Sequence, residues 1–141
     1  MAAPILVAED EETDVALLRL AFEKAGLVAH LVVAHDGQEV VDYLRSTAEP
    51  DGSARQMPGL VLLDLKMPRM GGLEVLAWLH SQPRLKDLPV LIFTSSSHEL
   101  DTQRALEMGA REYLVKPHAL QDLVKLLREL HARYLDSAVS R

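Results

Sequence analysis

Residues 60–72 read Leu-Val-Leu-Leu-Asp-Leu-Lys-Met-Pro-Arg-Met-Gly-Gly. Four consecutive apolar residues, Leu60 to Leu63, lead directly into Asp64. A short apolar run between turn residues is typical of a strand that is buried on both faces of a parallel sheet. Open parallel sheets bind their ligands outside the carboxyl ends of the strands. Asp64 therefore lies where such a fold carries out its chemistry, although an aspartate that only opens a turn is the alternative at this point.

The composition is that of one globular domain. The chain has 141 residues, of which 48% are hydrophobic, as expected for a single packed core. It has no cysteine, which excludes disulfides, thiolate metal sites and a cysteine nucleophile. The net charge of −6 argues against direct nucleic-acid binding, for which a basic patch is expected. The apolar run at residues 5–8 is too short for a signal peptide or a membrane span, so we expect a cytoplasmic protein without membrane contact.

Strand-like and helix-like segments alternate along the chain. The sequence predicts strands at residues 5–8, 29–34, 60–63 (or 64), 89–93 and 112–115, and helices at about residues 12–25, 37–46, 73–81, 98–108 and 119–135. Asp36 and Ser96 or Ser97 are expected N-caps, and Gly26 and Gly109 are expected to end two helices. This order predicts an α/β fold with right-handed crossovers and a parallel sheet that is covered on both faces. Neither a dinucleotide-binding glycine motif nor a P-loop occurs in the sequence.

Polar residues follow four of the five predicted strands. Glu9 and Asp10 follow the first, Asp64 the third, Thr94 the fourth and Lys116 the fifth. Carboxylates that converge raise one another's pKa, and a hard divalent ion with oxygen ligands, such as Mg²⁺, relieves that repulsion. A cation and a hydroxyl beside the metal suit an incoming phosphoryl group, with Asp64 as the nucleophile that forms an acyl phosphate. Each residue alone has an ordinary structural explanation; their common position at strand ends favours the functional one.

The chain resembles the receiver domains of two-component response regulators, the family of the chemotaxis regulator CheY. The motifs that carry the resemblance are Leu-Val-Ala-Glu-Asp, the stretch at residues 60–72, Phe-Thr-Ser-Ser and Tyr-Leu-Val-Lys-Pro. The resemblance covers about residues 4–135 and implies a single receiver domain for residues 1–141, with a frayed tail at 136–141. It also implies a flavodoxin-like (βα)5 doubly wound sheet of strand order 2-1-3-4-5.

The resemblance assigns roles to the acidic residues and to the loop after Asp64. Asp64 is similar to the phosphoacceptor of the family, and Glu9 and Asp10 to its acidic pair, with Asp10 as a direct metal ligand. The backbone carbonyl of Lys66 should supply another oxygen to Mg²⁺. Lys66 departs from the chemotaxis protein, which has Asn there, so its side chain could alter dephosphorylation or occupy the phosphate site. Gly71 stands where many members have Asp, which we interpret as a minor change in loop geometry.

The remaining strand-end residues match the switch of the family. Thr94 and Lys116 correspond to the hydroxyl and the lysine that contact the phosphoryl group. Tyr113 corresponds to the aromatic residue whose rotamer couples to Thr94. The resemblance also implies a cis peptide bond between Lys116 and Pro117.

The implied partner is a histidine kinase. A narrower resemblance links the chain to small single-domain regulators paired with bacterial and cyanobacterial phytochromes. It rests on the motif Glu-Asp-x-x-x-Asp-Val, the long loop at residues 47–59, the stretch Leu-x-x-Leu-Pro-Val and the long last helix. A bacteriophytochrome is therefore our hypothesis for the kinase.

The output surface is expected to be the face formed by the helix at 98–108, the strand at 112–115 and the last helix, because no output domain follows residue 135. In the last helix, Leu126, Leu130 and Tyr134 form a second apolar stripe at helical spacing. This stripe predicts a homodimer through the last helix. The alternative is that Leu130 and Tyr134 continue the core stripe.

The favoured function is a signalling switch, not a metabolic enzyme, with self-catalysed phosphoryl transfer and autodephosphorylation as its only chemistry. The alternative is a phosphohydrolase that uses Asp64 as its nucleophile. Haloacid-dehalogenase-type phosphatases require a second Asp two residues later, where this chain has Lys66. A flavin carrier of the same topology would place the flavin phosphate at residues 9–12, where four carboxylates would repel it.

Overall fold

The five strands form one parallel sheet in the order β2-β1-β3-β4-β5. The computed structural model describes residues 3–27, 30–49, 55–95 and 98–135. The strands are β1 Ile5–Ala8, β2 Leu31–Ala34, β3 Leu60–Leu63, β4 Val90–Thr94 and β5 Tyr113–Val115. Every neighbouring pair is parallel. The predicted α/β doubly wound fold and its strand order are confirmed.

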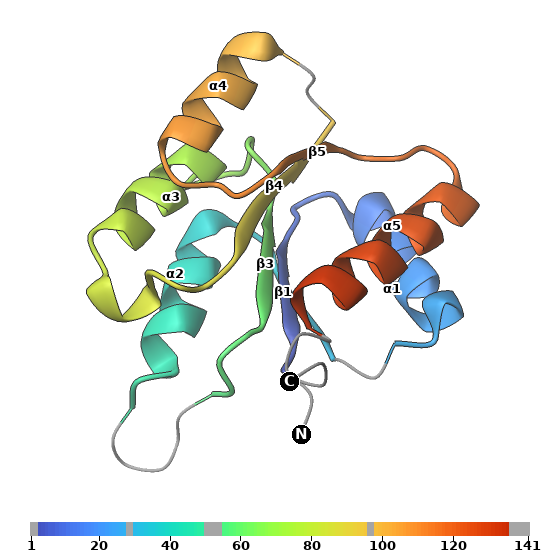
Figure 1. Ribbon diagram of the computed structural model, residues 1–141, viewed down its shortest axis with the longest axis horizontal. Helices are drawn as coiled ribbons and strands as arrows, with labels where there is room; N and C mark the ends of the chain where they lie inside the picture. Colours follow the sequence, from blue (N-terminus) through green and yellow to red (C-terminus); the bar gives the residue numbers. More distant parts are fainter. Residues whose placement is uncertain (1–2, 28–29, 50–54, 96–97, 136–141) are drawn as a thin grey trace.

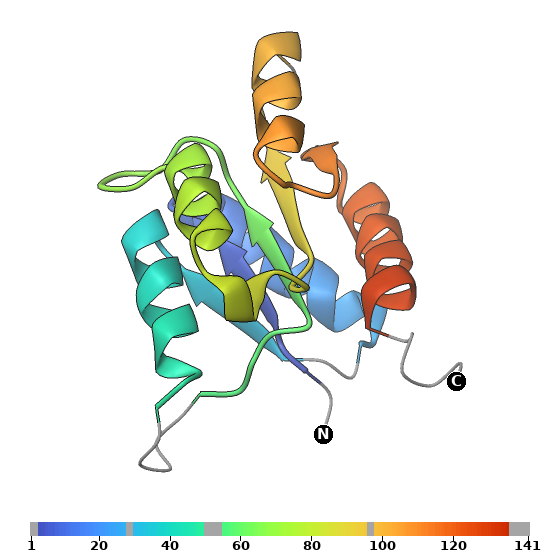
Figure 2. The same ribbon diagram turned by 60° about the vertical axis from the view of Figure 1, so that its left-hand side comes forward.

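Helices cover both faces of the sheet (Figures 1 and 2). They are α1 Glu12–Ala25, α2 Gly37–Ser46, α3 Gly72–His80, α4 Glu99–Glu107 and α5 Leu120–Tyr134, with a short 3-10 helix η1 at Pro83–Leu85 that the sequence did not predict. Helices α1 and α5 pack together on one face, and α2 and α3 on the other, with α4 beside α3 and β5. Among the described residues, no helix is long and apolar enough to cross a membrane.

The central strands β1, β3 and β4 consist almost entirely of apolar residues because both of their faces are buried. Successive strand residues point to opposite faces, and the core accordingly divides into two clusters. Val61 and Leu63 of β3 belong to the cluster beneath α2 and α3, whereas Leu60 and Leu62 pack against α1 and α5. All four side chains are fully buried. This explains why β3 shows an unbroken apolar run instead of an alternating pattern.

Most of the predicted helix ends agree with the structure. The backbone of Gly26 is left-handed (φ 66°) at the end of α1, and the side chain of Asp36 accepts a hydrogen bond from the backbone N–H of Glu39 at the start of α2. Gly109 also has a positive φ, two residues after α4 ends. Helix α4 begins at Glu99; the predicted caps Ser96 and Ser97 lie outside the described residues.

Two expectations are wrong. Leu130 is fully buried in the core cluster beneath α1 and α5, so it cannot take part in an exposed stripe. It continues the core stripe of α5, because it stands three residues after Leu127 and seven after Leu123, both of which are buried on that face. Leu126 and Tyr134 are partly buried against the same cluster. The Lys116–Pro117 bond is trans, as no cis peptide bond occurs among the described residues; trans is the more stable isomer of most X–Pro bonds.

Candidate functional site

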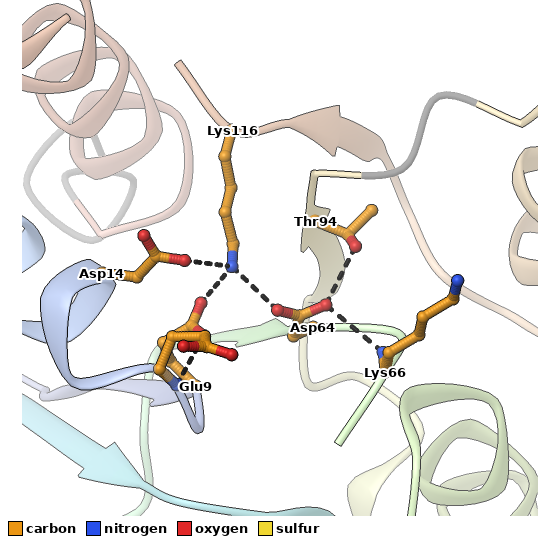
Figure 3. A network of polar contacts seen from close by, with 7 residues as sticks. Glu9, Asp14, Asp64, Lys66, Thr94 and Lys116 are labelled. Carbon is orange, nitrogen blue, oxygen red and sulfur yellow. Dashed lines mark hydrogen bonds and ion pairs between the residues drawn. The ribbon is translucent and has the colours of Figure 1, made fainter. Parts of the chain in front are cut away.

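The parallel register brings the carboxyl ends of β1, β3 and β4 side by side. Ala8 pairs with Leu63, and Leu63 pairs with Ile92, two residues before the end of β4. The residues that follow these paired positions therefore share one edge of the sheet. Figure 3 shows that the side chains predicted from the strand ends do converge there.

Both oxygens of the Asp64 carboxylate have hydrogen-bond donors. Oδ1 accepts a hydrogen bond from the hydroxyl of Thr94 (2.9 Å) and a longer one from the backbone N–H of Lys66 (3.3 Å). Oδ2 accepts a hydrogen bond from Nζ of Lys116 at 2.8 Å. Asp64 is 7% exposed, so this carboxylate is held in one orientation at the floor of the site. The prediction that Asp64, Thr94 and Lys116 lie together is confirmed.

The ammonium group of Lys116 contacts three carboxylates: two that follow β1 and β3, and one in the first turn of α1. Its Nζ contacts Oδ2 of Asp64, Oε1 of Glu9 and, at 3.2 Å, Oδ2 of Asp14. Burial by itself lowers the pKa of Lys116, but the hydrogen bonds to Asp64 and Glu9 and their negative charges outweigh it, so the pKa is raised above its usual value. Lys116 is therefore a permanent cation at neutral pH.

Glu9 is the most deeply buried carboxylate of the site, with 2% exposure. Burial raises its pKa above the usual value, and the hydrogen bonds from Lys116 and from the backbone N–H of Glu11 oppose that rise without cancelling it. Proton binding to Glu9 would weaken a metal site at this edge. The position of Lys116 limits that effect because it supplies positive charge directly to Glu9.

The sequence reasoning missed Asp14 as a member of the site. In the sequence, Asp14 stood out only as part of the motif Glu-Asp-x-x-x-Asp-Val, which resembles phytochrome-type regulators. Asp14 lies in the first turn of α1 and lines the same cavity as Asp10. Its spacing from Asp10 gave no signal, because Asp10 precedes the helix, and its contact with Lys116, 102 positions away, required the folded structure.

The carboxylates fit a hard divalent cation. Glu9, Asp10 and Asp64 each offer an oxygen atom, and these atoms lie within 4.8 Å of one another. Oxygen ligands at this spacing suit Mg²⁺ or Mn²⁺. A cavity of about 470 Å³ opens over the site and is lined by Asp10, Glu11, Asp14, Asp64, Lys66, Thr94, Ser95 and Lys116. It leaves room for a phosphoryl group beside the carboxylates.

Lys66 and Tyr113 are placed differently from the strand-end residues. The ammonium group of Lys66 points away from Asp64 (Figure 3), while its backbone N–H reaches the carboxylate. The expected role of its carbonyl as a metal ligand stays a prediction. Tyr113 is half-buried against the core cluster beneath α2 and α3, and its coupling to Thr94 also stays a prediction.

The fold and the site together define a class of protein. Residues 5–128 match the family described as the response regulator receiver domain, and the chain belongs to that family. Proteins with this domain are signalling components of two-component systems, and they bind Mg²⁺ or Mn²⁺ at an acidic pocket.

The similar proteins include several phytochrome-type regulators. Response regulator Rcp1 of Synechocystis is 32% identical over 133 residues, which are 94% of this chain and 89% of that protein. The Mn²⁺-bound crystal structure of Rcp1 superposes with a TM-score of 0.79 at 30% identity and covers 96% of both chains. Response regulator RPA3017, described in red light signaling of R. palustris, gives 0.84 at 31% identity, with 96% of this chain and 95% of that chain covered. The phosphorylated cyanobacterial phytochrome regulator RcpA gives 0.82 at 29% identity and covers 95% and 94%.

Proposed function

We propose that this protein is a response regulator whose Asp64 accepts a phosphoryl group from the phosphohistidine of a partner kinase. The single observation that supports this most directly is the pair of side-chain donors on Asp64. The hydroxyl of Thr94 donates a hydrogen bond to one carboxylate oxygen, and Nζ of Lys116 donates one to the other. Both lie beside an acidic cluster that suits Mg²⁺. We assign Glu9, Asp10, Asp64 and the carbonyl of Lys66 to the metal.

The proposed transfer forms a bond between a carboxylate oxygen of Asp64 and phosphorus, and breaks the bond between phosphorus and the histidine nitrogen. The imidazole leaves with that electron pair. Bound Mg²⁺ would neutralise charge on the phosphoryl oxygens during this exchange. Lys116 supplies a second cation, since its raised pKa keeps it charged. The Thr94 hydroxyl, which now donates to Oδ1, is placed to donate to a phosphoryl oxygen instead.

We further propose that phosphorylation is read out at the face formed by α4, β5 and α5. Leu100, Leu106 and Val115 are large apolar side chains of α4 and β5 that are 63%, 46% and 47% exposed. Exposed large apolar side chains on these neighbouring elements favour contact with a partner. In this scheme, inward movement of Thr94 and of the Tyr113 ring changes the preferred arrangement of that face.

The experiment that tests the proposed function is phosphorylation by a small acyl phosphate in the presence of Mg²⁺. Intact-protein mass spectrometry should show a gain of one phosphoryl group, and EDTA should prevent it. Asp64→Asn should abolish the gain, because it removes the nucleophile at nearly constant shape. Asp42→Asn is the matched control, since Asp42 is an exposed carboxylate of α2. A gain that survives Asp64→Asn would refute the assignment.

The kinase is proposed to be a bacteriophytochrome. The support is the similarity to RcpA, described as a phytochrome response regulator, and to RPA3017, described in red light signaling. Phosphotransfer from a panel of histidine kinases tests this proposal. Bacteriophytochrome kinases should transfer phosphate faster than unrelated kinases, and equal rates across the panel would contradict it.

A homodimer through α5 also remains a proposal, now without Leu130. Leu126 and Tyr134 are the two residues of the expected stripe that are partly exposed. Light scattering coupled to size exclusion, before and after phosphorylation, should show a dimer that Leu126→Ala weakens. A monomer at high concentration in both states would refute it. Cytoplasmic location and the lack of direct nucleic-acid contact stay predictions from the sequence.

A further inference from the structure

The loop between β3 and α3 carries two of the groups that we assign to the metal, Asp64 and the carbonyl of Lys66, and hydrogen bonds within the loop hold it in a compact shape. The N–H of Gly72 donates to the carbonyl of Leu65 (3.0 Å), and the N–H of Met70 donates to the carbonyl of Pro68 (2.6 Å). Lys66 lies inside this closed segment, and its N–H reaches Asp64. The position of the loop therefore affects both the nucleophile and the carbonyl that we assign to the metal.

The N-terminus of α2 holds this loop from outside the site. Oδ2 of Asp36 accepts a hydrogen bond from Nε of Arg69 at 2.8 Å and forms an ion pair with its Nη2 at 2.7 Å. Its other oxygen caps α2 by accepting from the N–H of Glu39 at 2.9 Å. Next to it, the N–H of Gly37 donates to the carbonyl of Met70 at 2.9 Å. We call these contacts of Asp36 and Gly37 with Arg69 and Met70 the α2 clamp.

The backbone of Arg69 adopts a conformation that is unfavourable for any residue other than glycine. Among the described residues, Arg69 is the one non-glycine residue with a positive φ, at 62°. A side chain with a Cβ is disfavoured there, and glycine would adopt the same turn more easily. The side chain of Arg69 is 62% exposed, so burial does not explain an arginine at this point. The bond between its side chain and the buried carboxylate of Asp36 explains why an arginine stands there.

We propose that Arg69 is a positioning residue for the metal site: through the α2 clamp it holds the loop that carries Lys66 and Asp64 in the conformation that binds Mg²⁺. This inference rests on the proposed function. It also predicts whether Mg²⁺ binding becomes tighter or weaker when Arg69 is replaced. Loss of a positive charge near an acidic cluster should by charge alone tighten Mg²⁺ binding, whereas loss of the clamp should weaken it, because binding must then order the freed loop.

Arg69→Gly separates these effects, since it removes the side-chain part of the clamp, the bond to Asp36, and also relieves the unfavourable backbone. We expect the dissociation constant for Mg²⁺, measured by titration calorimetry, to rise about tenfold, the equivalent of ordering roughly one backbone residue. The rate of phosphorylation by an acyl phosphate should fall at limiting Mg²⁺ and recover at saturating Mg²⁺. The unfolding midpoint in EDTA should change little. Arg69→Lys should restore part of the affinity, and Arg19→Ala on α1 controls for the lost charge.

Asp36→Asn provides the second arm, because asparagine keeps the helix cap but loses the ion pair. Combined with Arg69→Gly, it should add no further loss of Mg²⁺ affinity. Unchanged or tighter Mg²⁺ binding in Arg69→Gly would overturn the positioning role, as would additive losses in the double variant. A wild-type protein that binds Mg²⁺ but accepts no phosphoryl group would instead overturn the proposed function, and the Mg²⁺ affinities alone would still decide whether the clamp acts.

Discussion

Lys116→Met should make the stability of this protein depend on divalent metal. The substitution keeps an unbranched side chain of similar length and removes the cation that three carboxylates share. Two of those carboxylates, on Glu9 and Asp64, are only 2% and 7% exposed. They would be left close together, partly dehydrated and without their common partner.

The size of the effect follows from this burial. Breaking a buried ion pair by removing one partner costs about 3–5 kcal/mol. The third pair, to Asp14, adds little because the side chain of Asp14 is 46% exposed. We therefore expect a loss of about 3 kcal/mol in EDTA, which lowers the unfolding midpoint of a domain of this size by about 10 °C.

Mg²⁺ should reverse most of that loss. A ligand at one hundred times its dissociation constant stabilises the folded state by about 2.7 kcal/mol, and the variant should bind Mg²⁺ more tightly because the competing ammonium of Lys116 is absent. In EDTA the variant should also gain stability as the pH falls, since burial raises the pKa of Glu9 and a proton removes its unpaired charge.

The assay is thermal unfolding in EDTA and in saturating Mg²⁺. Lys125→Met is the matched control, because Lys125 is exposed on α5. It should leave both midpoints close to those of the wild type. A Lys116→Met variant that is as stable as the wild type in EDTA would refute the reasoning, because Glu9 and Asp64 would then need no cation.

Three further substitutions test the packing around the site. Leu130→Ala should lower the free energy of unfolding of the monomer by about 3 kcal/mol in urea titrations, as a cavity in the core does, whereas Leu126→Ala should cost clearly less; equal losses would contradict the burial of Leu130. Asp36→Asn should destabilise the protein near neutral pH. The hydrogen bonds from Glu39 and Arg69 outweigh burial and lower the pKa of Asp36 below its usual 3.8. The stability difference between the wild type and Asp36→Asn should therefore be complete above about pH 4 and vanish as the pH falls through the lowered value. A stability difference that does not depend on pH would argue against this reasoning. Gly37→Ala should strongly destabilise the protein, because an added Cβ would overlap the carbonyl oxygen of Met70; a near-native unfolding midpoint would show that the α2 clamp can move aside.

Asp64 and Thr94 could be assigned to one site before the structure because of a general property of parallel sheets. Apolar runs marked the central strands most clearly, since both faces of β1, β3 and β4 are buried. The alternation of strands and helices made the sheet parallel, and parallel strands end at a common edge. Residues that follow the strands, such as Glu9 and Lys116, therefore had to meet. The strand order itself came from the family resemblance, because local patterns do not specify which strands are neighbours.

Contacts between helices and loops required the tertiary structure. Asp14 reaches Lys116, and Arg69 reaches Asp36, across 102 and 33 positions. No periodicity specifies such pairs, because they depend on how α1 and α2 lie against the sheet. The same limit applies to Leu130, since the apolar residues of α5 fit more than one stripe at helical spacing and only the packing shows which stripe faces the core. By itself, the sequence determined the carboxylate, hydroxyl and lysine of the site. Packing decided how Asp14 and the α2 clamp hold them in place.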